Sequence, residues 1–292
     1  MSKPVPVPTP LEKRTAIDEV LGVFRHVPPS KTLDHLGRFL STWSGTDKSL
    51  MTVQYSSKTI VGILLFLQGI RTRLNLSTAG KTPSGVAPLT SLADIIGDAR
   101  ILFRIWGLLP MIQWLISLER SPPPTKLLLQ IERIQAWSMV AYCPMEALAY
   151  LGYHKVLNIS EHRQNWLWKH ALRLWLLYVV LQFVHIFENN RLLRLRAKAL
   201  ERSRGHPKPH PSKKTSEEVV PLTEEQQVTR RMWDELQERK NALVTNFWIY
   251  VGYLPPSVHW AVPSGVMAES WVGFFGAIAA IGGMVTSWKA TA

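Results

Sequence analysis

The sequence predicts an all-α protein that associates with a membrane through interfacial amphipathic helices and a C-terminal transmembrane helix rich in Gly and Ala. First, the stretch from Trp271 to Trp288 carries no charge. As a helix it would be roughly 27 Å long, close to the hydrocarbon thickness of a bilayer. Second, apolar residues elsewhere recur at helical spacing, and no segment shows the sustained alternation of a strand. Third, 12 Trp residues accompany a formal charge of +13, which favours contact with an acidic lipid surface.

The composition also excludes several classes of protein. Hydrophobic residues make up 46% of the 292-residue chain; a polytopic transporter would be more apolar and a cytosolic enzyme less so. The single cysteine, Cys143, permits neither a disulfide framework nor a Cys-pair metal site and fits a reducing compartment. No nucleic-acid motif accompanies the positive charge. We therefore expect an anionic lipid membrane as the partner and no nucleic acid.

Shifts in composition divide the chain into four parts. Residues 1–29 are a Pro-rich N-terminal segment with a short helix, and residues 30–204 are a continuous helical region. Residues 205–222 are a flexible basic linker. Residues 223–292 contain a helix, an apolar hairpin and the C-terminal membrane anchor.

Capping residues and prolines set the expected helix boundaries in the second part. Pro110 and Pro144 are expected to kink the helices that contain them. The residues Ser91 to Asp94 resemble a capping box and would open the third helix. The expected helices run from Ser30 to about Ser41, from Gly45 or Thr46 to about Leu76, from Ser91 to about Glu119, from Thr125 to about Leu157, and from Ser160 to about Arg204.

In the last part, Thr223 is expected to cap a helix that is polar until Asn241 and then apolar. The Pro255-Pro256 pair is expected to break this helix. Residues 241–268 would then dip into the membrane as a hairpin before the final span.

Three other uncharged runs are shorter than a membrane span. They follow Lys58, Arg104 and Arg173 and contain twelve to fourteen residues each, a length typical of core, re-entrant or interfacial helices. The run after Arg173 reaches the length of a span if the residues from Trp166 are included and the arginine snorkels. Both interpretations of that run remain open.

The expected helix after Ser91 has a wide apolar face at helical spacing. Such a face can lie in a lipid interface, but it is equally compatible with the core of a helical bundle. Arg100 and Arg104, one turn apart on another flank, would contact lipid headgroups. The side chains predicted to insert into the membrane are Leu92, Ile95, Ile96, Leu102, Phe103 and Trp106.

A basic run follows the apolar segment that ends at Glu188. Arg191, Arg194 and Arg196 lie in it and are predicted to contact anionic headgroups from the cytosolic side. The alternative is a solvated helix end whose cations favour its dipole.

Small residues recur every four positions in the final helix, a pattern that lets membrane helices approach closely. We expect this seam to join copies of the chain. Trp271 and Trp288 would anchor the two ends of the helix at the membrane interface. The predicted seam residues are Gly273, Gly276, Ala277, Ala280 and Gly283.

Sets of catalytic residues do not assemble in the sequence. His185 and Glu188 lack further ligands, and His206 and His210 lie in the linker. The common nucleotide, hydrolase and zinc-protease motifs are missing. We therefore expect no enzyme activity, no cofactor and no metal.

Four blocks of the sequence resemble the peroxin-11 family. Thr46 and Met51 replace arginines usual in the first block, and Ile101 and Gly107 replace lysines of the second, as in a divergent fungal-type member. The blocks are Leu36 to Leu40 with Gly45 to Lys48 and Gln54-Tyr55, then Ala99 to Arg104, then Ala147 to Tyr150, and finally Val272 to Trp288.

The resemblance implies an integral protein of the peroxisomal membrane whose helical regions face the cytosol. Residues 30–204 would elongate the membrane and promote peroxisome proliferation and fission. The implied partners are further copies of the chain, the import receptor for peroxisomal membrane proteins and the dynamin-related fission machinery. Two alternatives stay open: a solute pore, lined by Arg173, Gln182 and His185, and a soluble helical scaffold.

Overall fold

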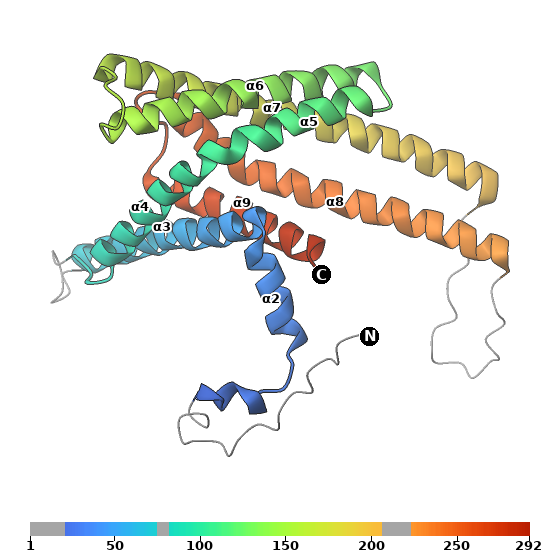
Figure 1. Ribbon diagram of the computed structural model, residues 1–292, viewed down its shortest axis with the longest axis horizontal. Helices are drawn as coiled ribbons and strands as arrows, with labels where there is room; N and C mark the ends of the chain where they lie inside the picture. The colour runs from blue at the N-terminus through green and yellow to red at the C-terminus, as the bar shows by residue number, and fades with distance from the viewer. Residues whose placement is uncertain (1–20, 75–81, 206–222) are drawn as a thin grey trace, which may run out of the picture.

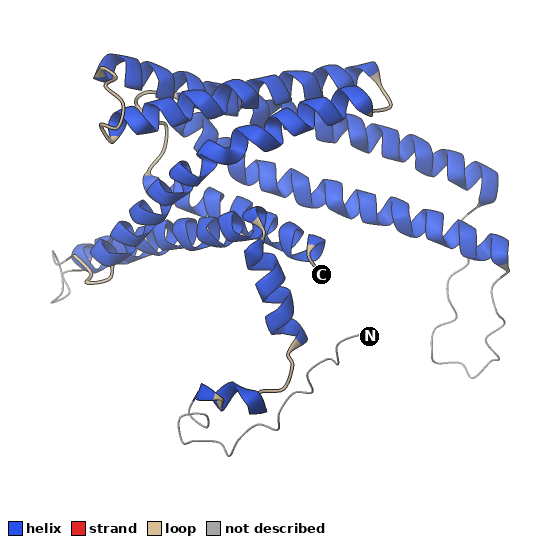
Figure 2. Cartoon of the chain, viewed as in Figure 1, coloured by secondary structure: helices blue, strands red, loops and turns tan. Residues whose placement is uncertain are grey.

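The computed structural model describes residues 21–74, 82–205 and 223–292, and within these ranges the regular elements are all helical. Figure 2 shows the same composition. The all-α fold class is confirmed. The expected linker 205–222, apart from Gly205, and most of the N-terminal segment 1–29 lie outside the described residues. The elements are η1 (Val23–His26), α2 (Lys31–Ser41), α3 (Trp43–Arg73), α4 (Val86–Arg104), η2 (Ile105–Gly107), α5 (Leu108–Arg120), α6 (Lys126–Tyr153), α7 (Glu161–Arg204), α8 (Glu224–Ala261) and α9 (Glu269–Ala290).

Two groups of helices share the molecule (Figure 1). Helices α3 and α9 lie side by side, and α4 packs on α3. Helices α5, α6 and α7 form the second group, and α8 packs on both α7 and α9. The continuous path from α4 to α5 therefore connects the groups on one side, and α8 connects them on another. The far ends of α7 and α8 extend together as a long arm, and α2 projects from the start of α3.

Most helix starts follow the capping residues identified in the sequence. The Ser30 hydroxyl accepts a hydrogen bond from the Leu33 amide at 3.3 Å, and the Thr125 hydroxyl accepts one from the Leu128 amide at 3.3 Å. Thr223 and Gln226 form a full capping box at the start of α8. Each bond satisfies an amide that the first helical turn leaves unpaired. The boundaries at Ser30, Thr125 and Thr223 are confirmed.

Two expected boundaries were wrong. Helix α4 begins at Val86, five residues before Ser91, so the resemblance to a capping box there had no structural meaning. Pro88 fits this start because the first turn of a helix has no use for the amide that proline lacks. The predicted kink near Pro110 is present as the short 3₁₀ segment Ile105–Gly107.

The second wrong boundary is Pro255-Pro256. Helix α8 continues through both prolines and ends at Ala261, next to Val262 and Pro263. Pro256 and Ser257 are fully buried at this point. Packing against the neighbouring helices therefore outweighs the loss of two backbone hydrogen bonds. The hairpin expected within 241–268 is instead the turn between α8 and α9.

Four helical stretches are long and apolar enough to cross a membrane, by length and composition. Three of them contain the runs judged too short from the sequence, because each run lies in a longer helix in which an apolar window of 18 residues holds at most two charges. The stretches are Trp43–Arg73, Val86–Arg120, Glu161–Arg204 and Glu269–Ala290.

Candidate membrane surface and buried charged cluster

The outward face of α4 carries most of the side chains predicted to insert. Ile95 and Trp106 are about two-thirds exposed, at 68% and 67%. Trp43, from the start of α3, meets the Phe103 ring edge-to-face at 5.9 Å and is itself half exposed. Five exposed apolar side chains, four on α4 and Trp106 on the adjoining η2, form one surface that we call the α4 surface. They are Leu92, Ile95, Leu102, Phe103 and Trp106.

Ile96 does not belong to the α4 surface, and its assignment is corrected. It is 8% exposed and shares the inner face of α4 with Ala93 and Arg100. This face packs on α3. The wide apolar stripe therefore divides into an inner half, covered by protein, and an outer half that no described residue covers.

Arg100 is also corrected: it is buried and does not reach a headgroup from the surface. Its Nε donates to Asp47 Oδ1 at 2.8 Å, and its Nη1 donates to Gln54 Oε1 at 2.7 Å. Asp47 and Gln54 lie two turns apart on one face of α3, which places both acceptors opposite Arg100. A buried guanidinium needs such partners.

Arg104 lies one turn further along and faces inward as well. Its Nη2 is 3.1 Å from Glu146 Oε1 on α6, and the same oxygen accepts the Tyr142 hydroxyl at 2.6 Å. Its Nε is buried without a hydrogen-bond partner among the described residues. The Arg104 side chain is nevertheless 39% exposed, so its contact with a headgroup stays a prediction.

The basic run after Glu188 is exposed, as its predicted role requires. Arg194 and Arg196 are exposed, and the side chain of Arg191 is 63% exposed while it binds Glu188 through two hydrogen bonds, of 2.8 and 2.9 Å. These residues lie in the C-terminal third of α7. Contact with headgroups stays a prediction.

The small-residue seam of α9 packs inside the chain. A Cβ added at Gly276 would lie 2.3 Å from the Tyr55 ring, and one at Gly273 would lie 2.9 Å from the Thr59 amide nitrogen. Gly283 faces the side chain of Lys48, and Ala280 is fully buried; Ala277 is partly buried against the same core. The expected seam between copies is corrected: α3 and α8 already occupy it.

The two terminal tryptophans of α9 differ. Trp271 is 56% exposed, as an interfacial anchor requires. Trp288 instead packs against α2, with ring centroids 3.8 Å from His35 and 5.2 Å from Phe39. His35 Nε2 also lies 3.1 Å from the Trp288 carbonyl oxygen. Trp288 therefore attaches α2 to the end of α9, which its interfacial assignment did not foresee.

The three residues proposed for a pore do not share one passage. His185 faces Glu132 on α6 at 3.0 Å, whereas Gln182 donates to the Tyr178 hydroxyl at 3.1 Å. Arg173 is exposed.

The charged residues that do converge line a cavity of about 390 Å³ between α3, α4, α6, α7 and α8, called here the central cavity. No role for Asp47, Gln54 or Glu146 was predicted from the sequence. Their partners lie on other helices, which the pattern within one helix does not identify. A signal was present: polar residues spaced seven apart in α3 and four apart in α6. The charges that line the central cavity are Asp47, Lys48, Arg100, Arg104 and Glu146.

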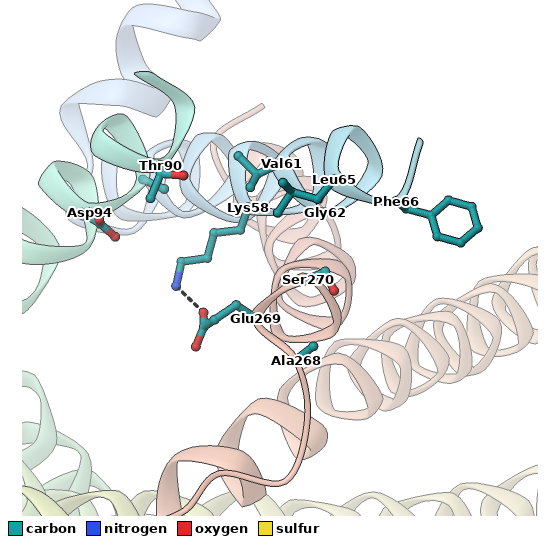
Figure 3. Close-up of a pocket in the computed structure, with 11 residues that line it drawn as sticks. Lys58, Val61, Gly62, Leu65, Phe66, Thr90, Asp94, Ala268, Glu269 and Ser270 are labelled. Atoms are coloured by element: carbon teal, nitrogen blue, oxygen red, sulfur yellow. Dashed lines mark hydrogen bonds and ion pairs between the residues drawn. The ribbon is translucent and has the colours of Figure 1, made fainter. Parts of the chain in front are cut away.

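A second hollow, of about 670 Å³, lies where α9 begins (Figure 3). Lys58 reaches from α3 to Glu269 at 2.8 Å, and Val61 and Leu65 line the α3 side. The ion pair fixes the entry of α9 against α3. In the described part of the chain, no three His, Cys, Asp or Glu side chains are placed to hold a metal ion.

Comparison with known proteins agrees with this architecture. The model of the family described as peroxisomal biogenesis factor 11 (PEX11) matches residues 33–288. No curated protein and no solved structure matches the sequence. The match spans α2 to α9, and the family is one of peroxisome biogenesis factors rather than of enzymes. The chain belongs to the peroxisomal biogenesis factor 11 family, whose members act in the proliferation and division of the peroxisomal membrane.

Proposed function

We propose that this protein elongates the peroxisomal membrane by inserting the α4 surface into the cytosolic leaflet. The main supporting observation is that the five side chains of the α4 surface are 41–68% exposed within the described chain. Side chains of this size remain uncovered only at a cost, so they indicate a surface that another medium solvates. Lipid fits because the other three candidate spans would hold the chain in a bilayer.

The free energy available supports insertion. Full burial of a large apolar side chain contributes about 1.5–3 kcal/mol. Five side chains that are roughly half exposed therefore supply on the order of 5 kcal/mol. The inserted side chains expand the cytosolic leaflet relative to the other leaflet. The membrane then bends into a tubule that the fission machinery can cut.

Topology and partners complete the proposal. Arg191, Arg194 and Arg196 contact anionic headgroups on the cytosolic side, and α9 anchors the C-terminus in the peroxisomal membrane. Homo-oligomers concentrate the effect, and since the α9 seam is occupied they form through another surface. The resemblance to the family supports the import receptor and the dynamin-related fission machinery as the other partners.

Reconstitution tests the proposal. The full chain is added to anionic liposomes, and tubules are counted by electron microscopy for wild type, Phe103→Asp and Trp106→Asp. Both variants are expected to bind liposomes but to form at least about tenfold fewer tubules, since a carboxylate cannot enter the acyl region. Met232→Asp, at an exposed apolar position on the polar half of α8, is the matched control.

Tubulation that persists in both α4 variants would remove the assigned role. Two further measurements address the alternatives. A membrane shaper gives no conductance in planar bilayers, whereas a pore does. A soluble scaffold is released by carbonate extraction, whereas a chain with spanning helices stays in the pellet.

A further inference from the structure

We propose that the central cavity binds the phosphate of a phospholipid headgroup. This inference concerns the inner face of α4, whereas the proposed function uses the outer one. It is carried by the charges in the cavity, by an unpaired donor and by a neighbouring apolar pocket.

The central cavity carries more positive than negative charge. Three cationic side chains line the cavity, Lys48, Arg100 and Arg104, against two carboxylates, those of Asp47 and Glu146. The surplus is one positive charge among side chains that are 10–39% exposed. A cation there is costly unless it is paired, and charged side chains within candidate spans mark functional sites. An anion would complete the balance.

The central cavity also has more hydrogen-bond donors than acceptors to pair with them. Both carboxylates are already engaged: Asp47 by Arg100 at 2.8 Å and by Lys48 at 3.6 Å, and Glu146 by Tyr142 and Arg104. Donors remain in excess. Arg104 Nε is buried without a partner within the ranges described. An acceptor with several oxygens suits this arrangement, and a guanidinium binds phosphate through paired donors.

The size of the central cavity and the pocket beside it suit a lipid headgroup with its acyl chains. About 390 Å³ lies within the range of sites for small ligands. Asp47 and Arg100 also line a second pocket, of about 360 Å³, together with the apolar side chains of Trp43, Leu50 and Phe103. Trp43 and Phe103 are half exposed, so this pocket opens toward the medium that solvates the α4 surface. Acyl chains would lie along it while the phosphate reaches the arginines, which favours a lipid over a free phosphate.

Calorimetric titration of the full chain in maltoside micelles tests the site with dihexanoyl phosphatidic acid as the probe. The double variant Arg104→Gln/Glu146→Gln removes the guanidinium without leaving Glu146 unpaired, and it keeps the net charge. It is expected to bind at least about tenfold more weakly, the loss of one charged hydrogen bond. Arg133→Gln/Glu119→Gln, which removes an ion pair exposed outside the cavity, is expected to bind like wild type.

Two further probes distinguish the source of the phosphate. Dihexanoyl glycerol is expected to bind weakly, and binding as tight as that of the phosphatidic acid would overturn the site. Glycerol 3-phosphate is expected to bind weakly because it lacks acyl chains; equal binding would retain the phosphate contact and overturn the lipid assignment.

Wild-type affinity in the double variant would also overturn the proposal. If that variant is not monodisperse and helical, Arg104→Lys carries the test, since it keeps the charge and loses the Nε donor. Trp106→Asp lies outside both pockets and is expected to keep lipid binding while losing tubulation, so that the two proposals fail separately.

Discussion

Helices α4 and α9 are both apolar and both belong to candidate spans, but they are solvated differently. Six of the 22 residues of α9 are buried within the chain, against three of the 19 residues of α4. The difference follows side-chain size. Glycines and alanines on α9 let α3 and α8 approach to backbone contact, whereas Ile95 and Phe103 on α4 remain 68% and 48% exposed. Small residues predict helix pairs, and large ones predict the surface left to lipid.

The largest effect is expected where α9 touches α3. Gly273→Val places a side chain against the backbone of Lys58 and Thr59 and should lower the free energy of unfolding by about 3 kcal/mol. Gly69→Val is the matched control, because a Cβ at Gly69 meets nothing within 4 Å. Denaturant unfolding in detergent, followed by near-UV circular dichroism, measures both. Equal stability of the two variants would mean that the seam does not pack within the chain.

The next effect separates inward from outward arginines. Arg100→Met leaves Asp47 without its main partner and should cost about 2 kcal/mol, less than a fully buried pair because Asp47 is partly exposed. Arg133→Met removes its exposed pair with Glu119 and should cost at most about 0.5 kcal/mol. The same unfolding assay compares the two variants. If Arg100→Met is as mild as Arg133→Met, Arg100 is available to lipid after all.

A smaller effect is expected at the two ends of α9. Trp288→Ala removes two ring contacts to α2 and should cost about 1–2 kcal/mol. Trp271→Ala should leave the unfolding free energy in detergent unchanged and instead weaken membrane retention. Limited proteolysis near residue 30 reports the release of α2. Release by both variants, or by neither, would contradict the different environments of the two tryptophans.

The smallest effect is expected in the alkylation rate of Cys143, which is buried on α6. Burial, and next to it the charge of Glu146, raise the pKa of the Cys143 thiol to about 11, while Arg104 opposes the shift. Because only the thiolate reacts, alkylation by a maleimide should be slow at pH 7 and should rise about tenfold per pH unit up to pH 10. A cysteine with an ordinary pKa would level off near pH 8.5. Quenched-flow mass spectrometry measures the rate, and a plateau below pH 9 would show that Cys143 is not covered.

Much of this molecule follows from local chemistry. Hydroxyl side chains at Ser30, Thr125 and Thr223 set helix starts because each acts on amides within three residues. Periodicity indicated the helix that contains α4, although α4 starts at Val86 and Ile96 turns inward. Local signals failed where tertiary packing opposed them. Pro255 and Pro256 remain helical because α8 is packed against its neighbours at that point.

The sequence by itself determined that the chain is helical, that the final helix suits a membrane, and that small residues line one face of α9. Only the tertiary structure decided what each face meets. Ile96 and Arg100 turn inward because α3 presents Asp47 and Gln54 to that side of α4, and the α9 seam closes on α3 rather than on a second chain. Such choices depend on partners that lie far apart in sequence, and the spacing of residues along one helix carries no record of them.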